Sequence, residues 1–241
     1  MALKIILIIL AIIVALFLCS VLVIVVSSLL IDPSKVYSAD SSYYRFLLYF
    51  STVCAVFLIR IKVEAEGLEK LPKGRFLLVG NHRSKFDPIL TWHVMRKQKL
   101  AYISKPENFR IPAYGRIIRR CCFMPIDRED PIGAAKTVNH AAKLMIDDQV
   151  SVAVYPEGTR NYGDGLLPFH NGLFRIAQKA GVPVVVVSVK GTDRIHKNYP
   201  LRASRVKISV LDVIPESVVK TTRTNDLGER VRETLLNDLS K

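Results

Sequence analysis

Two long apolar runs open the chain. Residues 5–31 are apolar apart from a few small polar side chains, and about 20 such residues suffice to cross the hydrocarbon core of a bilayer. Asp32-Pro33 ends this run, and residues 45–61 form a second apolar stretch flanked by basic residues. The pattern predicts a transmembrane helix over 5–31 and a second membrane helix over 45–61, which either spans the bilayer or lies in one leaflet.

A cleaved signal peptide is the alternative interpretation of the first run. The apolar part of such a peptide is only about 7–15 residues long, and no clear small-x-small cleavage site follows residue 31 here. We therefore expect an uncleaved anchor. With one membrane span or with two, the basic residues that follow favour placing the rest of the chain on the cytoplasmic side of a cell or organelle membrane.

After residue 63 the pattern changes to short apolar runs that alternate with amphipathic segments. The apolar runs are typical of buried strands and lie at residues 76–80, 100–104, 150–154, 184–189 and 206–211. Helices are predicted over residues 89–95, from Asp130-Pro131 onward, over 171–180 and over 225–239. This alternation predicts an α/β fold, a mixed sheet layered with helices, preceded by the membrane-embedded helical segment. We divide the chain at residue 62 accordingly, into 1–62 and 63–241.

The helix that Asp130-Pro131 opens carries apolar residues at helical spacing. We expect one of its faces to be buried, and the residues concerned are Ile132, Ala135, Val138, Ala142 and Met145.

Polar residues capable of chemistry lie between the first strand and the first helix of this region, in the segment Asn81-His82-Arg83-Ser84-Lys85-Phe86-Asp87-Pro88. On one helix, residues five positions apart are about 140° apart and share no face. Across a strand-to-helix turn His82 and Asp87 can meet, with Asp87 as the helix cap and Pro88 as the first helical residue. The purely structural alternative is that Asp87 is only a helix cap and that His82 is solvated.

A second polar segment, Tyr155-Pro156-Glu157-Gly158-Thr159-Arg160, follows the strand predicted at 150–154. Open α/β sheets bind ligands beyond the carboxyl ends of their strands. We therefore expect both polar segments to lie at the same edge of the sheet.

Together the two segments resemble the signature of the 1-acylglycerol-3-phosphate acyltransferase family, Asn-His-x4-Asp followed by an aromatic-Pro-Glu-Gly-Thr-Arg block. The resemblance covers roughly Glu64 to Lys190. It implies a membrane-bound enzyme of phospholipid biosynthesis that transfers a fatty acyl group to the sn-2 hydroxyl of 1-acylglycerol-3-phosphate, forming phosphatidic acid. The segment Phe169-His170-Asn171-Gly172 departs from the family's Lys-rich pattern. Another lysophospholipid or glycerol-3-phosphate is therefore the alternative acceptor.

For this chemistry we expect His82 to act as general base and Asp87 to fix its tautomer. The chain has no Gly-x-Ser-x-Gly elbow, and its cysteines have no partner that the sequence identifies. Direct transfer without an acyl-enzyme is therefore the simpler mechanism.

The acceptor phosphate is expected to bind Arg160, because the planar guanidinium group contacts phosphate bidentately. The backbone N–H groups of Gly158 and Thr159 lie close by in the sequence.

The resemblance also implies that Lys105 and Arg128 belong to the acceptor pocket, and that Glu157 binds the acceptor or orients an arginine. A surface salt bridge with Glu129 or Asp130 is an equally good interpretation of Arg128.

The net charge and the cysteine pattern limit which classes of partner and cofactor are expected. The net charge is +14, and residues 1–62 contribute little of it, so a basic domain next to a membrane suggests anionic lipids or substrates. Nucleic acid is not expected, because no helix-turn-helix, zinc-finger or RNP pattern is present. The four cysteines form no Cys-x-x-Cys, so we predict neither a metal site nor a cofactor, only acyl-CoA or acyl-carrier protein as co-substrate.

The segment 116–124 mixes arginines with large apolar residues. It is either a helix whose apolar face enters the core, followed by a strand, or a rim that docks on the membrane beside the active site.

Two functions of other classes remain open. One is a metal-dependent phosphohydrolase that uses His82, Asp87, Glu157 and His170. The other is a non-catalytic basic anchor that binds anionic lipid.

Overall fold

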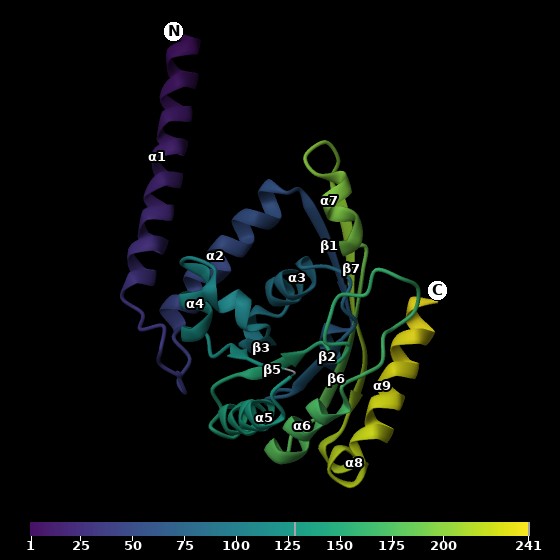
Figure 1. The fold of residues 1–241 in the computed structure, drawn as a ribbon. Coiled ribbons are helices and arrows are strands. Elements are labelled where there is room, and N and C mark those ends of the chain that lie inside the picture. Colours follow the sequence, from purple (N-terminus) through teal and green to yellow (C-terminus); the bar gives the residue numbers. More distant parts are fainter. Residues whose placement is uncertain (128, 241) are drawn as a thin grey trace.

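The structure, a computed structural model, describes residues 1–127 and 129–240. Over these ranges one mixed sheet is covered by helices on both faces, and a long helix projects away from it (Figure 1). The strands are β1 (Ile61–Glu66), β2 (Leu77–Gly80), β3 (Leu100–Ser104), β4 (Met124–Pro125), β5 (Ser151–Val154), β6 (Val184–Lys190) and β7 (Ser204–Ile214). The helices are α1 (Ala2–Leu29), α2 (Ser42–Leu58), α3 (Phe86–Val94), α4 (Tyr114–Arg120), α5 (Pro131–Ile146), α6 (Arg175–Ala180), α7 (Ile195–Asn198), α8 (Glu216–Thr221) and α9 (Thr224–Leu239).

In the described part of the chain the sheet has seven strands in the order β1-β7-β6-β2-β5-β3-β4. Neighbouring strands are parallel except β6 and β7, which pair antiparallel. The four central strands β2, β3, β5 and β6 are apolar along nearly their whole length because helices cover both of their faces. The predicted mixed α/β sheet is confirmed, and the carboxyl ends of β2 and β5 lie side by side.

The apolar runs did not reveal the two outermost strands, and a strand near β4 was expected only within one interpretation of segment 116–124. β1 alternates apolar and charged residues and directly follows the second apolar run, so Ile61 was wrongly assigned to a membrane helix. At two residues, β4 is too short to leave a periodic pattern.

The first apolar run forms α1, the one helix in the described ranges that is long and apolar enough to cross a membrane. Its apolar side chains are exposed along almost its whole length. The second run forms α2, 17 residues long, which packs on the domain through residues such as Leu47 and leaves Phe46 and Phe57 exposed. This amphipathic burial shows that α2 belongs in part to the core of the sheet domain.

Arg45 fixes α2 to the domain. Its guanidinium group donates to the carboxylate of Asp40 at 2.7 Å and to the backbone oxygen of Leu100 in β3 at 3.0 Å. The group also lies over the ring of Trp92 in α3, 4.7 Å from the centroid. The Arg45 and Asp40 side chains are only 11% and 3% exposed, so each neutralises a charge that would otherwise be buried alone.

We predict that Arg45→Met lowers the free energy of unfolding by about 3–5 kcal/mol, because it leaves the Asp40 carboxylate buried without its partner. The measurement is chemical denaturation of the full chain in detergent micelles. Arg230→Met is the matched control: it breaks an exposed pair with Asp212, and we expect it to cost no more than about 1 kcal/mol. Equal losses in the two variants would contradict a buried pair.

The membrane-rim interpretation of segment 116–124 is wrong. Ile117 and Ile118 of α4 and Met124 of β4 are buried in the core, and the Arg120 guanidinium lies over the ring of Tyr37 at 4.5 Å. The alternative, a helix whose apolar face enters the core followed by a strand, is confirmed.

The face predicted for α5 is confirmed only in its second half. Val138, Ala142 and Met145 are buried, whereas Ile132 and Ala135 are exposed. Asp130 caps the helix as expected, since its side chain accepts from the backbone N–H groups of the first turn.

Candidate active site

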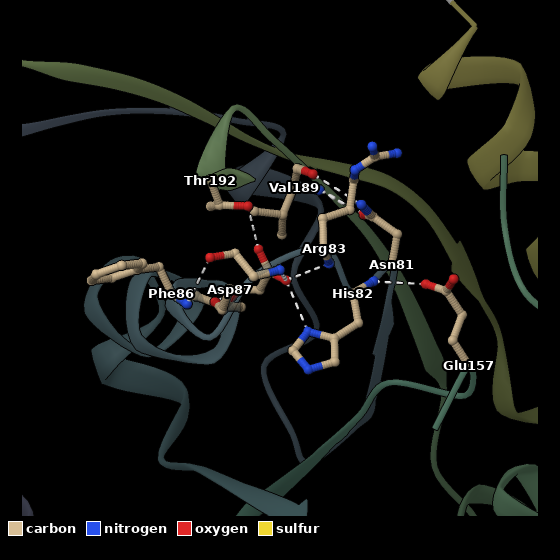
Figure 2. A network of polar contacts seen from close by, with 10 residues as sticks. Asn81, His82, Arg83, Phe86, Asp87, Glu157, Val189 and Thr192 are labelled. Atoms are coloured by element: carbon tan, nitrogen blue, oxygen red, sulfur yellow. Dashed lines mark hydrogen bonds and ion pairs between the residues drawn. The ribbon is translucent and has the colours of Figure 1, made fainter. Parts of the chain in front are cut away.

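His82 and Asp87 meet where β2 ends and α3 begins (Figure 2). Nδ1 of His82 lies 2.8 Å from Oδ2 of Asp87. An ionised carboxylate only accepts hydrogen bonds, so Nδ1 carries the ring proton and Nε2 keeps its lone pair. The His82 side chain is 18% exposed and that of Asp87 is fully buried, so a base can reach a substrate here while its partner stays shielded from water.

The Asp87 carboxylate is held by more than the histidine. Oδ2 also accepts from the backbone N–H groups of Arg83 and Ser84, both at 2.7 Å, and Oδ1 accepts from the Thr192 hydroxyl at 2.5 Å. The prediction that Asp87 caps α3 is wrong in detail, because the helix already begins at Phe86. The carboxylate instead organises the turn that precedes the helix.

Asn81 holds the start of the same turn. Its side-chain amide donates to the backbone oxygen of Val189 at 2.9 Å and accepts from that residue's N–H at 2.8 Å (Figure 2). These two bonds extend the pairing of β2 with β6 by one position through a side chain. The backbone at residues 81–82 can therefore turn out of the sheet while the N–H and C=O groups of Val189 in β6 keep hydrogen-bond partners.

An aromatic ring covers the imidazole. Tyr155, at the end of β5, stacks on His82 with ring centroids 4.5 Å apart and planes 15° apart. The Tyr102 ring lies 6.1 Å beyond it. Burial raises the pKa of both phenol groups well above the ordinary value, so both stay neutral. The stacked Tyr155 ring limits how the His82 ring can tilt.

A cavity of about 440 Å³ opens beside His82. Its wall contains four further residues that the sequence singled out: Lys105, Gly158, Thr159 and Arg160. Lys85 adds a third cation that sequence reasoning passed over, although it stands inside the His-x4-Asp motif. The rest of the wall is largely apolar and aromatic, with Phe86, Ile89, Tyr102, Ile103, Ile111, Tyr114 and Phe123. Three cations around an apolar cavity suit a ligand with an anionic head and an acyl chain.

The turn after β5 changes one detail of the predicted phosphate contact. The Gly158 N–H donates to the backbone oxygen of Tyr155 at 2.9 Å, closing a turn in which Gly158 has φ +71°. That amide is therefore engaged within the turn. The Thr159 N–H donates to no other residue in the described ranges and remains for a ligand.

Glu157 lies behind the cavity and not in its wall. It is 3% exposed, and its carboxylate accepts from the backbone N–H of His82 at 2.7 Å and from that of Leu167 at 3.0 Å. The nearby Arg160 side chain lies instead over the Tyr162 ring, 5.6 Å from the centroid. Glu157 thus fixes the backbone that carries the histidine. The prediction for Arg128 lies outside the described residues.

The side chains proposed for a phosphohydrolase do not converge. His170 lies on a separate cavity, and both oxygens of Glu157 are committed to backbone groups. Across residues 1–127 and 129–240 no three His, Cys, Asp or Glu side chains are grouped so that they could hold a metal ion. The geometry favours acid–base chemistry at His82.

The buried cysteines are poorly suited to act as nucleophiles. Burial raises the pKa of Cys121 and of Cys122 to about 12, so both thiols stay protonated near neutral pH and lack the reactive thiolate form.

Thr192 is the positioning residue that the sequence least revealed. We predict that Thr192→Val lowers kcat about tenfold, whereas Thr192→Ser keeps kcat near the wild-type value. Only the serine keeps a hydroxyl donor for Asp87. Steady-state kinetics and the thermal midpoint are measured together. A parallel loss in both variants would show that packing of the methyl group matters and that the hydrogen bond does not.

The acyltransferase family model matches residues 62–190, more than half of the chain. The chain is 34% identical over 118 residues to the 1-acyl-sn-glycerol-3-phosphate acyltransferase of Haemophilus influenzae, covering 49% of each protein. It is 28% identical over 183 residues to the alpha form of that enzyme from Bos taurus, covering 75% of this chain and 63% of the relative. The chain thus spans about half to just under two thirds of the length of these relatives.

The fold also matches a solved structure. The crystal structure of the 1-acyl-sn-glycerophosphate (LPA) acyltransferase PlsC from Thermotoga maritima superposes with a TM-score of 0.68 at 23% identity, covering 90% of this chain and 86% of that one. At this identity the match shows the fold alone. The family match and the intact His-x4-Asp motif together confirm the resemblance, and the chain belongs to the acyltransferase family.

Proposed function

We propose that this protein transfers a fatty acyl group from a thioester donor to the sn-2 hydroxyl of 1-acylglycerol-3-phosphate, producing phosphatidic acid in phospholipid biosynthesis. The observation that carries the proposal is the His82–Asp87 pair at the wall of an apolar cavity with three cations. The names of the relatives support the choice of acceptor.

The reaction balances with His82 as the only acid–base group. Nε2 accepts the proton of the acceptor hydroxyl as its oxygen attacks the thioester carbonyl carbon. The carbon–sulfur bond then breaks, and the imidazolium returns the proton to the leaving thiolate. Asp87, buried and hydrogen-bonded to Nδ1, stabilises the positive charge that the ring carries between these steps.

The acceptor phosphate is assigned to Arg160, with Lys105 and Lys85 on the same cavity wall. A phosphate group carries up to two negative charges, and a guanidinium group with neighbouring ammonium groups matches both its charge and its geometry. The apolar part of the wall then receives the glycerol backbone and the start of the acyl chain.

We predict that Arg160→Lys lowers kcat/KM for 1-acylglycerol-3-phosphate by about tenfold or more, because an ammonium group cannot reproduce the bidentate contact. A neutral monoacylglycerol should lose much less. The two acceptors are compared with the same donor in the same micelles, and equal losses on both would instead assign Arg160 a structural role.

An acceptor panel tests the function itself. Purified full-length protein is assayed with acyl-CoA and with acyl-carrier protein against 1-acylglycerol-3-phosphate, other lysophospholipids and glycerol-3-phosphate. We expect 1-acylglycerol-3-phosphate to give the largest kcat/KM. Phosphate release without ester formation would support a phosphohydrolase instead, and lipid binding without turnover of any donor would support a non-catalytic anchor.

The membrane arrangement completes the proposal. The exposed apolar surface of α1 and the exposed face of α2 suit a bilayer. We propose that α1 and the exposed face of α2 hold the protein at the membrane and that the sheet domain, from β1 onward, works on its cytoplasmic side, in line with the basic residues after α2.

A further inference from the structure

A second cavity of about 600 Å³ opens between α5 and the turn that leads into α6. It shares Ile103, Tyr155 and Gly158 with the cavity beside His82. The two cavities therefore adjoin at these three residues, one of which, Tyr155, carries the ring that stacks on the imidazole.

The lining of this second cavity combines an apolar floor with a basic rim. The floor consists of Ile103, Ile126, Ala134, Ala135, Val138, Val154 and Leu173. Arg175 and Lys179 lie four positions apart on α6, so they project from the same side of that helix, and both are exposed. Neither forms an ion pair with a residue in the described ranges. None of the described lining residues is acidic.

The proposed reaction requires separate binding sites for donor and acceptor, both of them next to His82. Direct transfer requires donor and acceptor to be bound at once, and the cations around His82 are already assigned to the acceptor phosphate. A donor must bring its thioester to His82 by another route. The cavity behind Tyr155 and Gly158 is placed to provide it.

We propose that this second cavity binds the phosphopantetheine arm of the acyl donor, with its phosphate on Arg175 and Lys179 and its thiol end directed toward Gly158. The inference rests on the proposed acyl transfer and assigns the donor side of that site. The arm is common to coenzyme A and to acyl-carrier protein. An acyl chain would use the apolar floor but would give the two exposed cations no partner, which is why the charged arm is the better match.

The first test measures binding without turnover. Arg175→Glu with Lys179→Glu should weaken the binding of coenzyme A and of free 4′-phosphopantetheine by about tenfold or more, while phosphate-free pantetheine binds equally to both proteins. The control variant is Lys62→Glu with Lys73→Glu, which makes the same change in charge at two exposed lysines outside both cavities. Calorimetry on the full chain in detergent micelles provides the affinities. Unchanged coenzyme A affinity in an enzyme that still transfers acyl groups would overturn this inference and leave the proposed function intact.

The second test identifies the source of the arm. Acyl-CoA, acyl-carrier protein and an acyl-N-acetylcysteamine thioester, which lacks the phosphate, are compared as donors. If the variant with Arg175→Glu and Lys179→Glu loses kcat/KM with one of the phosphorylated donors, and not with the N-acetylcysteamine thioester, the proposal is supported and the donor is identified. Equal loss with all three donors would overturn it, because no phosphate would then be recognised.

A third variant separates the arm from the acyl chain. Ala135→Trp places a large ring in the cavity from an exposed position on α5, so the fold should tolerate it. We expect weaker coenzyme A binding and an unchanged preference for acyl-chain length. A shift toward shorter acyl chains with unchanged coenzyme A binding would show that the cavity holds the acyl chain, and the proposal would be wrong.

Discussion

His82→Ala should reduce kcat by about 10²–10⁴-fold, because the site is proposed to contain no second group that can remove the acceptor proton. Binding of 1-acylglycerol-3-phosphate should change little, since the cations assigned to its phosphate are untouched. The experiment combines steady-state kinetics with equilibrium binding of the acceptor to the full chain in micelles.

The control for this substitution is His196→Ala, which removes an exposed histidine from α7. We expect it to keep both activity and thermal stability. If the His82 variant folds like the wild type and retains a near-normal kcat, the general-base mechanism fails. A fall in acceptor affinity equal to the fall in kcat would instead make His82 a binding residue.

Asp87→Asn should lower kcat by a similar factor of about 10²–10⁴, because an amide of the same shape cannot stabilise the imidazolium. The side-chain oxygen of the asparagine can still accept from His82, Arg83 and Ser84, and its NH₂ group can face the Thr192 hydroxyl. The substitution therefore removes the charge while keeping most of the geometry.

Asp87→Ala provides the comparison. It leaves two partly buried N–H groups of the turn without an acceptor, so we expect it to lower the thermal midpoint as well as kcat. The asparagine variant should lose activity with a much smaller change in stability. Equal destabilisation of the two variants would show that Asp87 acts through the fold and not through the charge of the imidazole.

The sequence predicted the central strands and the His82–Asp87 pair for one physical reason. Continuous apolar runs identify strands buried on both faces, and the polar residues that follow such strands collect at one edge of the sheet. The contact between His82 and Asp87 needed only five residues of chain and a turn, so local sequence was sufficient.

Contacts that depend on distant parts of the chain left no such signal. Thr192 lies 105 residues from the Asp87 carboxylate to which it donates, and a threonine after a strand has many ordinary roles. Segment 116–124 was left open between two interpretations for a different reason. Apolar residues beside arginines fit a membrane surface and a core helix equally well, and only the packing of Ile117 and Ile118 distinguishes the two.

The edge strands show the limit of periodicity. β1 pairs with β7 through six residues, but its alternation of apolar and charged residues began immediately after a run that resembled a membrane helix. The same ambiguity explains why the second apolar run was predicted only as a membrane helix. One apolar face of α2 packs on the domain, and the other is exposed.

Strand β6 and the residues just after it hold both ends of the turn that carries His82. Val189 binds Asn81 before the histidine, and Thr192 binds the carboxylate after it. Folding of β6 therefore sets the distance between the two ends of the turn before any substrate arrives. The conformational entropy of the five-residue spacing is lost once, during folding, and not again in each catalytic cycle. Insertion or deletion of a single residue in this turn would break that match even if His82 and Asp87 both remained.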